Sequence, residues 1–199
     1  MRSPRSARLH AVSPETDDRD ARAIRLDVPA IPETAAREIH VLCVSLHDGV
    51  PPLYRLLEVP SAMTLDRLHA VLQETFGWSG FDPHSFVTIY GEFFGLKGLP
   101  SRMAGRAGEP RDESGVTLAQ VAGEAGVGMV YLFGFHDEWR VDIWVETIVV
   151  AAPGVAYPRC TGGQGDDIPG GEFAYVQEFD PRELTEDLAD LAAVILPGS

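Results

Sequence analysis

One stretch, residues 51–78 (PPLYRLLEVPSAMTLDRLHAVLQETFGW), constrains the fold more than any other part of the chain. Residues 53–59 alternate with a period of two, which is typical of a strand, and Pro60 ends that pattern. Thr64 is a candidate N-cap, and Gly77 is placed to end a helix between them. The side chains that recur at spacings of three and four, with Val71 on their flank, are Leu65, Leu68, Leu72, Thr75 and Phe76. A strand followed so closely by an amphipathic helix favours an α+β fold, in which the helix packs on a sheet.

Further elements surround this unit. Residues 39–46 form a predicted central strand with apolar side chains on both faces, so we expect both faces to be covered. Residues 95–115 lack periodicity and are rich in Gly, Pro and Arg, which predicts a mobile excursion. Thr117 and Gln120 have the spacing of a capping box for a short second helix, and Asp180 with Pro181 opens a C-terminal helix. The remaining predicted strands are 86–90, 129–135 and 141–150.

The 199-residue chain is long enough for one core. Residues 1–37 hold few large apolar side chains, so we predict a disordered leader (1–37) followed by a single domain (38–199). An alternative for the leader is a basic arm that grips a partner through Arg2, Arg5 and Arg8. Two cysteines are too few for a disulfide framework, and the sequence contains neither a signal peptide nor a long apolar run. We therefore expect a cytoplasmic protein with no membrane association.

Charge limits the possible partners. The formal net charge is -14, and 23 of the 30 acidic residues but only nine of the 16 basic residues follow Glu38. A surface with this balance repels a phosphate backbone, so electrostatics disfavours nucleic-acid binding by the isolated domain. A protein partner is the expectation that remains.

Several motifs in fixed order resemble the plasmid pRiA4b ORF-3-like family. They are residues 51–78, the downstream HSF, the strand pair around YLFGFHDEWRVDIWVE, and YPRCTGGQGDDIPGGEFAY. The resemblance covers residues 39–191 and implies a mixed β-sheet with a packed amphipathic helix in a β-grasp-like arrangement. Members include proteins carried by plasmids and insertion elements, some of them resolvase-like passenger proteins. Family membership implies no established activity.

The chain departs from the family pattern at two places. Leu132 and Phe135 stand where relatives carry acids, and Trp139 comes two residues late, so an acidic pair is lost or displaced to Asp137 and Glu138. The loop after Cys160 lacks the second cysteine that relatives have. A paired-cysteine site therefore cannot be carried over to this chain.

Binding groups concentrate on loops that a rigid sheet supports, and two polar segments of the family region fit that description. We predict a site between the hairpin tip at 136–138 and the glycine loop at 160–171. Its ligand-binding candidates are His136, Asp137, Glu138, Trp139, Arg159, Cys160, Asp166 and Asp167. No cofactor motif is present, and no metal site is predicted.

Two functions stay open. The leading hypothesis is a non-catalytic binding or accessory domain associated with mobile genetic elements. The alternative is a metal-dependent hydrolase or nuclease, because Asp137, Glu138, Asp166 and Asp167 could supply the oxygen ligands of Mg²⁺ or Mn²⁺. His47, His69, His84 and His136 show no metal-ligand spacing. We expect His69 on the shoulder of the helix and His84 to order its loop by hydrogen bonding. A structural thiol is favoured for Cys160. For the aromatic side chains core or hairpin packing is favoured, and the alternative is an exposed rim that marks a partner surface; these residues are Trp78, Phe81, Phe86, Trp139 and Trp144.

Overall fold

The computed structural model describes residues 30–47, 52–78, 83–96, 109–134, 139–165 and 179–195. Strands and helices alternate irregularly along this part of the chain. In chain order the elements are η1 (Glu33–Arg37), β1 (Glu38–Leu46), β2 (Tyr54–Pro60), α1 (Leu65–Phe76), β3 (His84–Thr88), β4 (Phe93–Gly95), β5 (Arg111–Asp112), α2 (Leu118–Val121), β6 (Gly128–Phe133), β7 (Trp139–Val150), β8 (Arg159–Gln164) and α3 (Pro181–Ile195). None of the helices in these ranges combines the length and apolarity needed to cross a bilayer.

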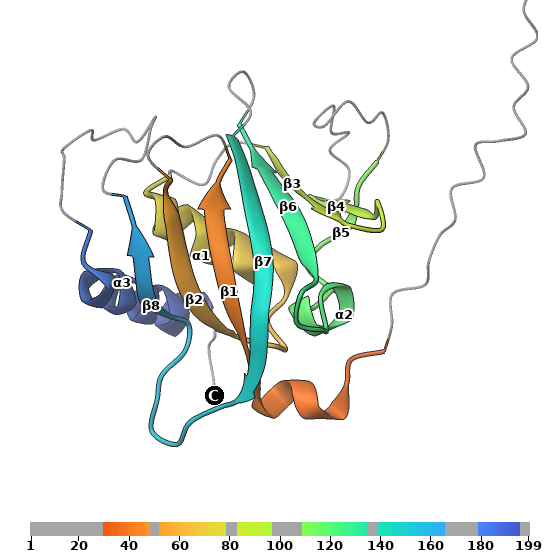
Figure 1. Ribbon diagram of the computed structural model, residues 1–199. Coiled ribbons are helices and arrows are strands. Elements are labelled where there is room, and N and C mark those ends of the chain that lie inside the picture. Colours follow the sequence, from red (N-terminus) through yellow and green to blue (C-terminus); the bar gives the residue numbers. More distant parts are fainter. Residues whose placement is uncertain are drawn as a thin grey trace, which may run out of the picture.

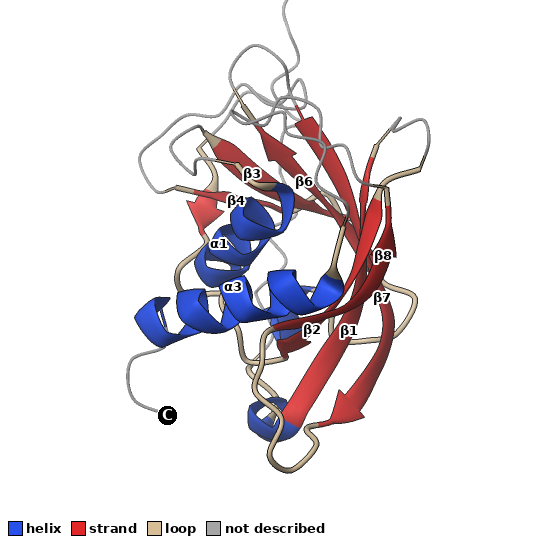
Figure 2. Ribbon diagram, turned by 90° about the vertical axis from the view of Figure 1, so that its left-hand side faces the viewer, coloured by secondary structure: helices blue, strands red, loops and turns tan. Residues whose placement is uncertain are grey.

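The strands form one mixed sheet in the order β5-β4-β3-β6-β7-β1-β2-β8. Only β4 and β5 pair in parallel, and every other neighbouring pair is antiparallel. Helices α1 and α3 lie on one face of the sheet, and Figure 1 looks onto the other face. The turned view in Figure 2 shows both helices on the same side of the strands. The expected α+β fold, with a mixed sheet and a packed amphipathic helix, is confirmed.

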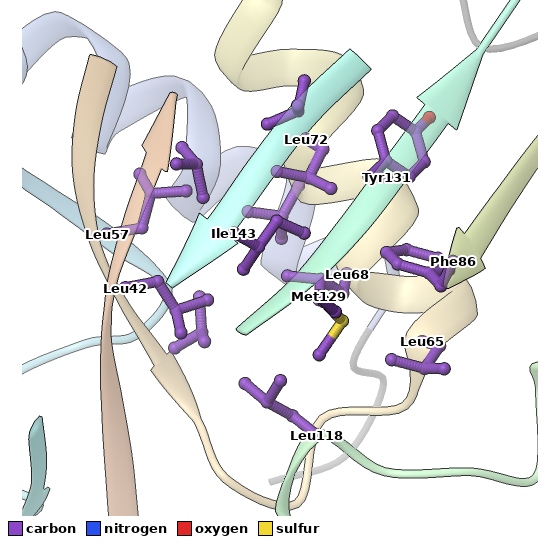
Figure 3. Close-up of a cluster of buried hydrophobic side chains, with 14 of the residues drawn as sticks. Leu42, Leu57, Leu65, Leu68, Leu72, Phe86, Leu118, Met129, Tyr131 and Ile143 are labelled. Carbon is purple, nitrogen blue, oxygen red and sulfur yellow. The ribbon is translucent and has the colours of Figure 1, made fainter. Parts of the chain in front are cut away.

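The core fills the layer between α1 and the sheet. Leu65, Leu68 and Leu72 of α1 are fully buried, as their helical spacing predicts. Figure 3 shows them among side chains that the strands and α2 direct into the same layer, namely Leu42, Leu57, Phe86, Leu118, Met129, Tyr131 and Ile143. Burying a leucine-sized side chain contributes roughly 1.5–3 kcal/mol, so this layer is the main source of the fold's stability.

Helix α1 ends as predicted but begins differently. Gly77 has φ 64°, a left-handed conformation that glycine adopts without steric cost, and the N–H groups of Gly77 and Trp78 bond to the carbonyls of Glu74 and Gln73. Thr64 occupies the N-cap, but its hydroxyl makes no capping hydrogen bond. The backbone N–H of Leu65 instead donates to the carbonyl of Val116 at 2.9 Å. A tertiary contact thus satisfies the helix start, which the local sequence could not reveal.

Three further expectations need correction. Strand β1 is internal in the sheet, but only its helix-facing side is fully buried, and Val41 and Cys43 are half-buried because none of the described helices covers the other face. Residues 93–95 and 111–112 form short strands inside or beside the predicted excursion, whose centre, 97–108, lies outside the described residues. Residues 159–164, expected to belong to a loop, form the edge strand β8.

The predicted leader overlaps the folded part at its end. Residues 33–37 form η1, whose Ala35 is buried and whose residues contact β1 and β2. The Arg37 carbonyl also accepts a hydrogen bond from the Ala151 N–H at 2.8 Å. Residues 1–29, including Arg2, Arg5 and Arg8, lie outside the described residues.

His40 connects β1 to the end of α2. Its ring is 1% exposed, and Nε2 lies 2.9 Å from the Ala122 carbonyl while Nδ1 lies 2.7 Å from Ser61 Oγ. Because a carbonyl only accepts, the proton of the neutral ring belongs on Nε2, and Ser61 donates to Nδ1. Burial lowers the pKa of His40 below its ordinary 6.5, although the Ala122 hydrogen bond and nearby Glu38 oppose that shift.

We predict that His40 makes the protein less stable in mild acid. Below about pH 6.5 the unfolded chain binds a proton at this position that the folded protein resists, so the free energy of unfolding falls as the pH drops through that region. Chemical denaturation of the wild type and of His40→Gln between about pH 8 and pH 5 measures this, and the variant should show a shallower dependence. Parallel curves for the two proteins would contradict the prediction.

Candidate functional site

Six strands end together at one end of the sheet, which we call the loop end. The register places Leu46 of β1 opposite Val141, Tyr54 of β2 opposite Gln164, and Phe133 of β6 opposite both Trp139 and His84. The carboxyl ends of β1, β6 and β8 therefore lie beside the amino ends of β2, β3 and β7. Loop ends of this kind present side chains from distant parts of a sequence to one region.

The predicted site residues divide between this end and the opposite one. Trp139 begins β7 at the loop end, and Gly165 follows β8 there. Arg159 begins β8 at the far end, opposite Glu58. Strands β1 and β2 separate β7 from β8, a spacing of roughly 14 Å across the sheet, so Trp139 and Arg159 are not neighbours. The other candidates lie outside the described residues: His136, Asp137, Glu138, Asp166 and Asp167.

Arg159 and Cys160 make contacts within the fold. The Arg159 Nε donates to Glu58 Oε2 at 2.6 Å, and this bond raises the pKa of the guanidinium. Cys160 is buried, which raises the pKa of its thiol, and its backbone N–H donates to Thr185 Oγ1 at 3.0 Å. Helix α3 thus covers the outer edge of β8 at this position, which limits pairing with another strand.

Through its buried side chain, Arg55 connects β2, β8 and Phe179 at the loop end. Its side chain is 2% exposed, and its guanidinium donates to the carbonyls of Tyr54, Gln164 and Gly165, each at 2.9 Å. The same group lies 3.7 Å from the centre of the Phe179 ring, a cation–π contact. Arg55 therefore contacts the last described residue before segment 166–178 and the first described residue after it.

We call the contacts of Arg55 with Tyr54, Gln164, Gly165 and Phe179 the Arg55 clamp. A glycine makes room for it. A Cβ atom at Gly163 would lie 2.8 Å from the Phe179 ring, 2.9 Å from Arg55 Cδ and 2.5 Å from the Tyr54 carbonyl. Each distance is shorter than ordinary contact between such atoms. The glycine-rich pattern around residue 163 thus has a packing cause, namely the close approach of Arg55 and Phe179.

Aromatic rings fill the middle of the loop end. The Trp78 ring stacks at 4.8 Å from Phe76, 4.9 Å from Phe133 and 6.2 Å from Trp139, measured between ring centres. The indole N–H of Trp78 is buried and has no hydrogen-bond partner within the described ranges. This cluster joins the end of α1 to the β6–β7 pair, so Trp139 is held by stacking as well as by its strand.

A second polar group of side chains lies between α1, β3 and the turn after β5. The rings of His69 and His84 stack at 3.6 Å with an angle of 7°, and His84 Nε2 lies 2.9 and 3.0 Å from the two carboxylate oxygens of Glu113. Gln73 donates to the Tyr131 hydroxyl at 2.6 Å, which leaves the hydroxyl hydrogen for His69 Nδ1 at 2.8 Å. Burial raises the pKa of Tyr131 above its ordinary value.

This histidine cluster connects elements and is largely closed to solvent. His84, Glu113 and Tyr131 are at most 5% exposed, so a substrate could not reach them without local opening. The sequence predicted a hydrogen-bonding role for His84 but only a place on the helix shoulder for His69, which also bonds to Tyr131. It missed Glu113, which lies within the segment 95–115 that lacks periodicity. Within the described ranges, no three His, Cys, Asp or Glu side chains are arranged to hold a metal ion.

Comparison with known proteins identifies the family. The model of the plasmid pRiA4b ORF-3-like protein family matches residues 38–183. The chain belongs to this family. It is 30% identical over 154 residues to the uncharacterised protein y4hQ of Sinorhizobium fredii (strain NBRC 101917 / NGR234), a match that covers 76% of this chain and 73% of the relative.

The pRiA4b ORF-3-like fold also has a solved counterpart. A crystal structure of the protein of unknown function MM3350 from Methanosarcina mazei Go1 matches with a TM-score of 0.56 and 25% identity. The match covers 64% of this chain and 70% of that one. MM3350 shares the architecture, and neither y4hQ nor MM3350 carries an assigned function in its description.

The motifs that carried the family resemblance meet in the structure. His69 of the first motif (residues 51–78) stacks on His84 of the HSF motif, and Trp78 of the first motif stacks with Trp139. Arg55 of the first motif binds the strand that contains Cys160. The family pattern in this chain therefore describes contacts between α1, the loop end and β8.

We predict that Arg55→Lys destabilises the protein by about 2 kcal/mol or more. Lysine keeps the positive charge but cannot reproduce the fork that bonds to three carbonyls or the planar stacking on Phe179. Urea denaturation of the variant measures the loss. Arg182→Lys, at an exposed position of α3, is the matched control and should change the free energy of unfolding by less than about 0.5 kcal/mol. Equal effects of the two substitutions would contradict the clamp.

Proposed function

We propose that this pRiA4b ORF-3-like chain is a non-catalytic binding domain that holds a protein partner at its loop end. The observation that carries the proposal is the Arg55 clamp, which fixes Gly165 and Phe179 on a buried guanidinium. The buried arginine holds these two residues in fixed positions at the loop end, and binding groups concentrate on loops that a rigid scaffold positions. The plasmid origin in the family's description supports an association with mobile genetic elements.

The polar side chains at the loop end favour a protein over a polyanion. Asp142 accepts from Arg140 Nε at 3.0 Å and lies 2.7 Å from His47 Nδ1, all three being partly exposed. Burial works against ionisation of Asp142, but the bonds from His47 and Arg140 lower its pKa. This group lies near the loop end on the face of β7 opposite the Trp139 ring, and it presents charges of both signs, as the polar rim of a protein interface does.

The proposal predicts site-specific contact with a partner. A photoreactive p-benzoylphenylalanine in place of His136, between β6 and β7, should give a discrete covalent adduct with another protein when cells of the native host are irradiated. The matched control carries the same group in place of Tyr90, which is 65% exposed in the turn between β3 and β4 at the other end of the sheet. Adducts from both positions alike, or from neither, would contradict binding at the loop end.

The same site offers a test of the metal-dependent alternative. If Asp137 and Asp167 held Mn²⁺ or Mg²⁺, a hundredfold excess of the ion over its dissociation constant would stabilise the fold by roughly 2.7 kcal/mol. The double variant Asp137→Asn, Asp167→Asn would abolish that stabilisation. On the binding proposal, thermal unfolding with either ion is the same for both proteins, and an ion-dependent difference would favour the hydrolase.

A further inference from the structure

The face of the sheet opposite α1 and α3, on which none of the described α-helices lies, is called the open face, and it has an apolar band at its centre. Trp144 of β7 is 50% exposed there, and the register places it beside Cys43 of β1, which in turn lies beside Leu56 of β2. Cys43 and Leu56 are half-buried, as are Val41 on β1 and Val130 on β6. These five side chains form the apolar band, which crosses four adjacent strands seen from the front in Figure 1.

Gly128 leaves room for the ring of Trp144 to pack against the backbone of β6. A Cβ atom at Gly128 would lie 2.4 and 2.6 Å from two carbons of the Trp144 ring, so the indole lies directly over the backbone of β6. The ring is thereby held across the sheet while half of its surface stays exposed. Rigid, half-exposed aromatic side chains of this kind are enriched at the energetic centres of protein interfaces.

The charges around the apolar band are mostly balanced within the face. Arg140 pairs with Asp142 on β7, and Arg159 of β8 pairs with Glu58 of β2. Glu146, in the β-bulge of β7, adds one negative charge. The whole chain carries a net charge of -14, so two copies that approach by most routes repel each other. Two copies that approach each other through their open faces meet less of this repulsion, because most charges on that face are paired.

The open face also has the dimensions of a stable interface. The five strands β6, β7, β1, β2 and β8 span roughly 24 Å, and the nine-residue β1 is roughly 30 Å long, which gives on the order of 700 Å². A standard protein interface buries about 800 Å² on each partner. Two such faces can pack sheet on sheet about 10 Å apart, with the apolar side chains between them.

We propose that the open face joins two copies of this chain into a symmetric dimer, with the apolar band at its centre. The contact is isologous, so Trp144 of one copy lies against the apolar band of the other. Helices α1 and α3 then face outward, and the loop ends of both copies stay accessible. The dimer does not depend on the proposed partner at the loop end, so either proposal can fail without the other.

The test is the molar mass of the full chain by sedimentation equilibrium at concentrations from about 1 to 100 µM. The wild type should approach twice the chain mass of 21.6 kDa. Trp144→Glu places two charges in the dry centre of the interface and should give a monomer. The matched control Tyr90→Glu changes an exposed aromatic residue outside the open face and should stay dimeric.

Folding of the variants is followed by circular dichroism. If Trp144→Glu does not fold, Leu56→Lys provides the same test from the neighbouring strand, because its half-buried side chain belongs to the same apolar band. A wild type that is monomeric at 100 µM overturns the proposal. So does a folded Trp144→Glu or Leu56→Lys variant that dimerises as the wild type does.

Discussion

The packing of α1 on the sheet is the interaction on which the rest of the structure depends. Leu65, Leu68 and Leu72 are fully buried against strands from both halves of the chain. One long face of the sheet carries none of the described α-helices, so the free energy that holds its strands together comes mainly from the other face. Removing α1 would expose apolar side chains on β1, β2, β3, β6 and β7 at once.

The same helix positions the parts that we associate with function. Its first turn is tied to Val116 by a backbone hydrogen bond, its middle carries His69 onto His84, and its end places Trp78 among the rings at the loop end. Arg55, on the strand before it, contacts Gly165 and Phe179 at the loop end. The loop end is therefore supported by buried contacts that run through the core, which is the condition for presenting a binding surface with defined geometry.

Local patterns predicted the elements well where periodicity was strong. The stripe of α1, its end at Gly77, the capping box at Thr117 and the start of α3 at Pro181 all follow from short-range chemistry. The sequence failed where a tertiary contact decides the outcome. Strand β8 contains three polar residues and two glycines in six positions, and it exists because β2 offers a partner and Arg55 binds its end.

The candidate site was only partly accessible to sequence reasoning. The predicted strand began at Val141, whereas β7 begins at Trp139. The distance between Trp139 and Arg159 depends on β1 and β2, which lie between β7 and β8 in the sheet but not in the adjoining sequence. Trp144 was expected in the core, because an alternating strand does not say which of its faces a helix will cover. Glu113 gave no signal, since its partner His84 lies 29 residues away.

The most direct test of this account is the unfolding of Leu68→Ala. Leu68 is fully buried at the centre of α1, so its truncation should lower the free energy of unfolding by about 2–5 kcal/mol. Urea unfolding should also remain one transition, with the same midpoint by tryptophan fluorescence and by far-ultraviolet circular dichroism. Two results would contradict the account: a decrease in the free energy of unfolding below about 1 kcal/mol, or a tryptophan fluorescence transition that precedes the loss of secondary structure. Either would show that the sheet and the loop end do not depend on the packing of α1.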